Sequence, residues 1–144
     1  MTSNRTKLAI FALFSGLLLI AGAALADSWP ASVEGTWTVI GSNDEGSLVI
    51  TQDAGTKSSL SKPIRGVIYK KDNIEGFYNP SSGRIFFARY RGKTIQVIQI
   101  WSGNLSQLIT GKPYRIGGML SVFKSGGLGG SLGEYNFSAV QTKK

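Results

Sequence analysis

Short runs of β-branched and aromatic residues alternate along this chain with clusters of Gly, Asn, Asp, Ser and Pro, and this alternation restricts the fold more than any other feature. Glycine accounts for 19 of the 144 residues, and pairs such as Gly117-Gly118 disfavour helix. After Asp27, no stretch carries an apolar stripe of helical period long enough for a helix. The pattern predicts an all-β protein with eight strands, at Gly35–Ile40, Ser47–Gln52, Ile64–Tyr69, Asn73–Tyr78, Arg84–Tyr90, Thr94–Ser102, Arg115–Phe123 and Gly133–Gln141.

Most connections between these strands are of hairpin length, so consecutive strands are expected to pair antiparallel. A sheet of eight such strands exposes two edges unless it closes on itself. Closure into an up-and-down barrel removes both edges. A β-sandwich is the alternative, but sandwiches usually need Greek-key crossings between sheets. The sequence therefore predicts a single eight-stranded antiparallel up-and-down β-barrel.

The amino-terminal residues have the layout of a secretory signal peptide. A basic start with Arg5 and Lys7 precedes an apolar run, and the small residues Ala24-Leu25-Ala26 offer a cleavage site. We expect residues 1–26 to be a signal peptide and residues 27–144 to form the barrel domain, secreted or periplasmic and without a membrane span after cleavage. The chain has 16 basic and 8 acidic residues; loss of Arg5 and Lys7 leaves 14 against 8, a formal charge of +6.

The chain contains no His and no Cys, which removes the commonest general base, the thiolate nucleophile and most transition-metal sites. Among the carboxylates, those of Asp44, Glu45 and Asp72 are expected to be solvated in turns. Only Glu75 and Glu134, each in a strand close to aromatic residues, are candidates to face a common cavity, and rim charges beside core aromatics are the simpler explanation. We expect a non-enzymatic protein with no catalytic residues, no metal site and no cofactor.

Basic and aromatic residues are interleaved around one predicted hairpin. They are Arg84, Phe86, Phe87, Arg89, Tyr90, Arg91 and Lys93. Strand alternation places Arg89 and Arg91 on one face, which we expect to point outward. Such a surface suits nucleic acid or an acidic glycan. Export argues against a nucleic-acid partner.

The strand at Thr94–Ser102 is apolar on both faces, because Ile95, Val97 and Trp101 alternate with Ile98 and Ile100. One set should fill the barrel. The other should lie outside, where a loop, a tail or a second copy of the chain would cover it. This leaves homo-oligomerisation open.

Two motifs resemble those of the calycin barrels, the avidins and lipocalins. Gly35-Thr36-Trp37 is similar to the G-x-W opening of their first strand, and Trp101-Ser102-Gly103 resembles a Trp-Ser-Gly stretch of streptavidin-like proteins. The last strand, Gly133–Val140, has a similar rhythm. The resemblance implies a barrel whose open end holds a small ligand above an aromatic floor. It does not extend to the biotin site, since Val39 and Tyr135 stand where the avidin pattern has an Asn and an Asp.

The favoured function is therefore an exported binding protein with a small-molecule or glycan ligand in, or at the mouth of, the barrel. The candidate ligand-binding residues are Trp37, Tyr69, Phe77, Tyr78, Gln96, Gln99, Trp101 and Asn136. A barrel filled by its own side chains is equally open. The alternative function is an envelope or extracellular interaction protein, an inhibitor or adhesion factor, that acts through its loops and the basic hairpin.

Overall fold

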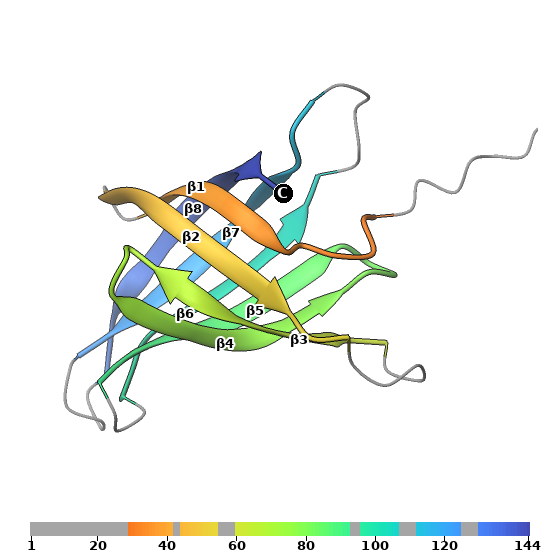
Figure 1. Cartoon of the computed structure of the whole chain (residues 1–144). Coiled ribbons are helices and arrows are strands. Elements are labelled where there is room, and N and C mark those ends of the chain that lie inside the picture. The colour runs from red at the N-terminus through yellow and green to blue at the C-terminus, as the bar shows by residue number, and fades with distance from the viewer. Residues whose placement is uncertain (1–28, 42–43, 55–59, 93–95, 107–111, 125–129) are drawn as a thin grey trace, which may run out of the picture.

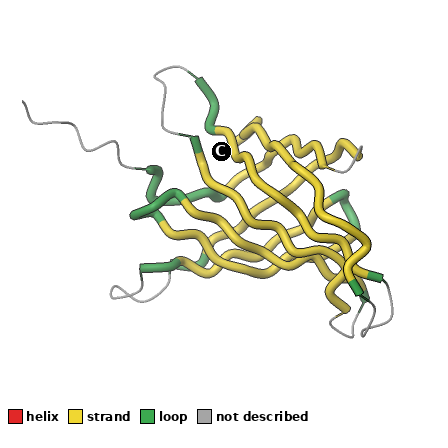
Figure 2. The backbone as a smooth tube through the Cα atoms, turned by 180° about the vertical axis from the view of Figure 1, so that it is seen from behind, coloured by secondary structure: helices red, strands yellow, loops and turns green. Residues whose placement is uncertain are grey.

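The chain folds into one closed layer of eight antiparallel strands (Figures 1 and 2). The computed structural model describes residues 29–41, 44–54, 60–92, 96–106, 112–124 and 130–144. The strands are β1 (Gly35–Gly41), β2 (Asp44–Gln52), β3 (Lys62–Ile68), β4 (Asp72–Asn79), β5 (Arg84–Arg91), β6 (Gln96–Leu105), β7 (Arg115–Phe123) and β8 (Ser131–Lys143). The described residues contain no helix, and so none that could cross a membrane.

Each strand pairs with its neighbours in sequence, and β1 pairs with β8 to close the barrel. In Figure 1, β1 (orange) and β8 (blue) lie side by side. The closing register matches Thr38 with Val140 and Ile40 with Ser138. The predicted all-β, eight-stranded antiparallel barrel is confirmed. The predicted signal peptide, residues 1–26, and Lys93 lie outside the described residues.

The interior of the barrel holds a core of 17 buried apolar residues. Alternation along each strand explains their placement, as in β1, where Trp37 and Val39 are fully buried between more exposed neighbours. The largest fully buried side chains are Trp37, Trp101, Tyr78 and Phe87. Barrels of eight strands have an interior just wide enough for side chains to fill, and here those side chains occupy it.

The segment that precedes β1 lies across one end of the barrel. The indole Nε1 of Trp29 donates to the carbonyl of Leu105 (3.2 Å), the hydroxyl of Tyr78 donates to the carbonyl of Pro30 (2.7 Å), and Gln52 Nε2 donates to the carbonyl of Ala31 (3.1 Å). These three contacts lie at the ends of β6, β4 and β2, which belong to different sides of the barrel. Residues 29–34 therefore close this end.

Candidate functional site

Three of the predicted ligand-binding residues belong to the core. Trp37, Tyr78 and Trp101 have no exposed surface. The indole of Trp37 donates to the carbonyl of Val33 (3.1 Å), and that of Trp101 stacks on Phe87 and meets Phe137 edge-on. In this structure the three side chains pack against the protein itself and present no surface to a ligand.

A buried ion-pair cluster lies at the other end of the barrel, which we call the mouth. The carboxylate of Asp72, at the start of β4, accepts hydrogen bonds from Arg89 and Arg91 of β5, with Arg89 Nε at 2.8 Å and Arg91 Nε at 3.1 Å. Arg89 Nη1 also donates to Gln99 Oε1 (2.9 Å), and the same oxygen accepts from Trp101 Nε1 (3.1 Å). The charged groups of the mouth thus satisfy one another.

This cluster corrects two expectations from the sequence. Arg89 and Arg91 do share a face, but it is the inner one, and Arg89 is buried. Asp72 belongs to a strand and is also buried, so it is not a solvated acid of a turn. The two errors have one cause. Arg89 and Asp72 can be buried because each neutralises the charge of the other, and the sequence of one strand does not reveal which residue on the next strand it will pair with.

The environment of Asp72 favours its charged form. Burial alone would raise the pKa of this carboxyl, but hydrogen bonds from Arg91 and Arg89 and their positive charges outweigh that effect and hold the pKa below its usual value. Asp72 therefore remains a carboxylate throughout the neutral range.

Tyr69 covers the cluster from the β3–β4 turn. The guanidinium of Arg89 lies 4.7 Å from the centre of the Tyr69 ring, a cation–π contact. The Tyr69 ring packs directly against Gly46, where a Cβ would come within 2.4 Å of the ring, so the absence of a side chain at Gly46 allows this position. Gln96 is half-buried at the start of β6, opposite Arg91 in the strand register. The structure thus brings Tyr69, Gln96 and Gln99 together at the mouth.

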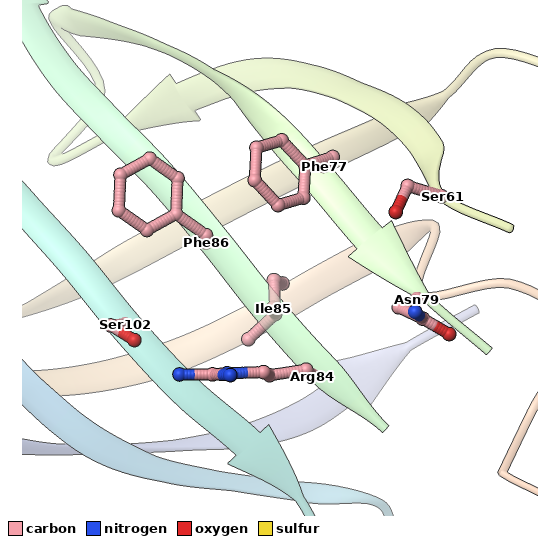
Figure 3. Close-up of a pocket in the computed structure, with 7 residues that line it drawn as sticks. All are labelled: Ser61, Phe77, Asn79, Arg84, Ile85, Phe86 and Ser102. Atoms are coloured by element: carbon pink, nitrogen blue, oxygen red, sulfur yellow. The ribbon is translucent and has the colours of Figure 1, made fainter. Parts of the chain in front are cut away.

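A separate hollow of about 260 Å³ lies on the outer face of β4, β5 and β6 (Figure 3). Phe77 and Phe86, from neighbouring strands, form its aromatic side, with ring centres 5.4 Å apart and planes inclined by 23°. Phe77 is 47% exposed although it is a large apolar residue. Ile85, whose side chain belongs to the core, also borders the hollow, and the polar lining consists of Ser61, Asn79, Arg84 and Ser102.

A second hollow of about 360 Å³ adjoins the first on β6, β7 and β8. The two hollows share Arg84 and Ser102 in their lining, so they lie side by side on the outer face, and we call them together the groove. The second hollow is also lined by Ile100, Asn104, Met119, Ser121 and Glu134, together with the backbone of Gly103 and Gly118. Ile100 belongs to the outward set of the strand that the sequence predicts to be apolar on both faces, and Trp101 of the other set is buried.

The register explains why the two hollows adjoin. Phe77 lies opposite Phe86, Phe86 opposite Ser102, and Ser102 opposite Met119, so one row of outward side chains crosses four strands. Asn136 extends the row onto β8 and is exposed. The structure therefore places the predicted residues Phe77 and Asn136 on the outer face and not in the barrel.

Arg84 is the charged residue common to both hollows. It is exposed, and it forms no ion pair within the part of the chain that the structure describes. Glu75 and Glu134 also point outward: Glu75 accepts a hydrogen bond from the Tyr90 hydroxyl (2.9 Å), and Glu134 accepts one from Ser121 (3.2 Å). The two carboxylates do not share an interior cavity, and only Glu134 lines the groove.

The described residues contain no group of three or more His, Cys, Asp or Glu side chains arranged to hold a metal ion. Comparisons of the chain with models of protein families, with curated proteins and with solved structures find no match. The eight-stranded closed antiparallel barrel is consistent with a calycin-like fold.

Proposed function

We propose that this chain is a non-enzymatic binding protein that takes a glycan or another small molecule in the groove on the outer face of its barrel. One observation carries the proposal: a stacked pair of aromatic rings, the exposed Phe77 and the half-buried Phe86, lies beside an arginine without an ion-pair partner among the described residues. Exposed aromatic residues with a few convergent polar groups are the usual composition of a binding site.

The outer face is a better candidate than the interior or the mouth. The interior is occupied by the fully buried rings of Trp37, Tyr78 and Trp101. At the mouth, the carboxylate of Asp72 already binds both arginines, so a ligand would have to displace bonds that exist. The groove needs no such displacement, because its aromatic rings and Arg84 face solvent.

Two further parts of the proposal depend on the sequence. The signal-peptide layout of residues 1–26 supports a secreted or periplasmic location. The G-x-W opening and the Trp-Ser-Gly stretch support a calycin-type barrel, avidin-like or lipocalin-like. The absence of His and Cys supports a binding protein over an enzyme.

A glycan array followed by titration in solution tests the proposal. We expect Phe77→Ala and Phe86→Ala each to weaken binding at least tenfold, because each removes half of the aromatic surface. Ile40→Ala is the matched control, since Ile40 is 50% exposed on the outer face of β1 and lines neither hollow. Equal affinity in all three variants would locate the site elsewhere.

A further inference from the structure

The charge pattern of the groove identifies the class of ligand. The hollow around Phe77 and Phe86 is lined by one cation, Arg84, and by no carboxylate. An exposed guanidinium without an ion-pair partner in the described chain favours an anionic group, and its planar fork fits a carboxylate through two parallel hydrogen bonds. The ligand at this hollow should therefore carry an acidic group.

The two aromatic rings indicate which chemical group of the ligand should lie next to its acidic group. The faces of Phe77 and Phe86 carry the negative part of the ring quadrupole, so they attract C–H groups presented side by side. A pyranose ring offers such a row of C–H groups on one face, and a uronic acid adds a carboxylate at its rim. A uronate ring on the two phenylalanines can thus place its carboxylate on Arg84.

The second hollow has a different polarity, because it contains the carboxylate of Glu134 in addition to the shared Arg84. Asn104, Ser121 and Glu134 supply amide, hydroxyl and carboxylate groups, which suit the hydroxyls of a neutral sugar, whereas Glu134 would repel a second acid. Phe86 and Met119 stand two strands apart, at a spacing of about 10 Å, which is close to the length of a disaccharide. The groove therefore suits an acidic sugar followed by a neutral one.

We propose that the ligand of this groove is an oligosaccharide in which acidic and neutral residues are adjacent, with its uronate over Phe77 and Phe86, its carboxylate on Arg84 and the neutral residue in the second hollow. This inference rests on the proposed function and names the class of ligand for the same site. Because Arg84 lies between the two hollows and binds the uronate carboxylate, it also determines the direction in which the oligosaccharide lies in the groove.

Titration calorimetry with three probes tests the inference: glucuronic acid, a hyaluronan tetrasaccharide of alternating glucuronate and N-acetylglucosamine, and the neutral tetramer of N-acetylglucosamine. We expect the hyaluronan tetrasaccharide to bind most tightly. Arg84→Gln should weaken its binding roughly tenfold to a hundredfold, the range for a charge-assisted hydrogen bond. Arg115→Gln is the control, because this substitution removes the same charge from an exposed residue of strand β7 that lines neither hollow.

A variant in the second hollow separates this inference from the proposed function. Asn104→Ala should weaken binding of the tetrasaccharide several-fold and leave that of glucuronic acid unchanged, because only the longer probe reaches Asn104. If Arg84→Gln and Arg115→Gln had equal effects, or if the neutral tetramer bound as tightly, the acidic ligand would be wrong while the binding site stood.

Two other outcomes would overturn more. Loss of the tetrasaccharide's advantage over glucuronic acid, with Asn104→Ala silent, would reduce the site to a single sugar and refute the extended ligand. If none of the probes bound, and sedimentation showed self-association that Phe86→Ala abolished, the groove would be an interface between copies of this chain, and both proposals would fail.

Discussion

At the level of single residues, Asp72 is the side chain on which the mouth of the barrel depends. Its carboxylate is 2% exposed and is shared by two arginines whose side chains are 9% (Arg89) and 55% (Arg91) exposed. Asp72→Asn keeps the shape but leaves Arg89 buried without a counter-ion, so we expect a loss of roughly 3–5 kcal/mol in the free energy of unfolding. Urea denaturation measures it.

The matched control is Arg91→Gln, which removes the exposed partner and should cost less than about 1 kcal/mol. Equal midpoints for the two variants would show that the carboxylate is not buried. Acid adds a second check. Because the pKa of Asp72 is lowered in the folded state, its contribution is complete above its unfolded pKa of about 4 and disappears as the pH falls through the folded value. Asp72→Asn should lack this part of the acid transition.

The ionisation of Tyr78 should lower the stability of the barrel at high pH. Burial, with a smaller contribution from Tyr114, raises the pKa of its phenol to about 12. A group whose pKa is raised on folding contributes stability that is complete below its unfolded pKa, about 10, and is lost as the pH rises toward the folded value. The loss should be on the order of 2 kcal/mol by pH 12.

Tyr78→Phe isolates this effect. Near neutral pH the variant should be about 1 kcal/mol less stable than the wild type, because it loses the hydrogen bond to the Pro30 carbonyl. Above pH 10 the two stability curves should converge and then cross, because the wild type loses more than the initial difference of about 1 kcal/mol while the variant has no phenol to ionise. Urea midpoints measured from pH 8 to 11.5 give both curves. Curves that stayed parallel would mean that the hydroxyl is accessible to solvent.

At the level of elements, the β3–β4 turn is conformationally strained. Tyr69 and Lys70 have φ values of 54° and 61°, and Lys71 N–H donates to the carbonyl of Ile68 (3.3 Å), as in a type I′ turn. The register pairs Ile68 with Asp72, so three residues connect the two strands. Asn and Gly are the usual residues there, because other residues pay roughly 1 kcal/mol or more in this conformation. The position of Tyr69 over Arg89 offsets part of that strain.

Lys70 has no such compensation, because its side chain is exposed. Lys70→Gly should therefore stabilise the protein by about 0.5–1 kcal/mol, after allowance for the greater freedom of Gly in the unfolded chain. Lys71→Gly should destabilise it, because Lys71 lacks a positive φ. The two denaturation midpoints should shift in opposite directions. A decrease for both variants would contradict the strained turn.

The same turn shows how far sequence patterns predict these elements. Composition and alternation located all eight strands, and β7 was predicted at Arg115–Phe123, its observed bounds. The sequence pattern predicts Tyr69 in a strand and Asp72 in a turn, because a Tyr-Lys pair is not typical of a type I′ turn. β6 continues to Leu105, beyond the predicted end at Ser102, because β5 and β7 continue its hydrogen-bond ladder past Gly103.

The candidate site was less predictable, for a physical reason. The β5 sequence Arg-Ile-Phe-Phe-Ala-Arg-Tyr-Arg has apolar and basic residues on both faces, so its alternation does not reveal which face is inside. The barrel buries Phe87 and Arg89 and leaves Arg84 and Phe86 outside. The inner face carries the core residues Ile85 and Phe87, and on that face Asp72 of the adjacent strand neutralises Arg89. Arg84 belongs to the predicted basic hairpin, but its position beside Phe77 in the same hollow depends on the strand register, which the sequence does not reveal.

At the level of the whole molecule, closure determines how the barrel unfolds. Antiparallel pairing of β1 with β8 leaves no strand at an edge, and β1 also carries Trp37 and Val39 into the common core. A sheet with free edges would fray at its outer strands. Here the loss of β1 or β8 would open the core and expose two edges at once, so the eight strands should unfold as one cooperative unit.

Native-state hydrogen exchange tests this cooperativity. We expect the slowest amides, those that exchange only through global unfolding, to occur in all eight strands, including amides of the ladder that joins β1 to β8. Their opening free energies should equal the free energy of unfolding from urea and fall with the same dependence on denaturant. Amides of β4 and β5 provide the internal comparison, because these strands lie opposite the closure. If β1 and β8 exchanged at clearly lower free energies than β4 and β5, the ladder between them would open by itself, and in solution the barrel would behave as a sheet with edges.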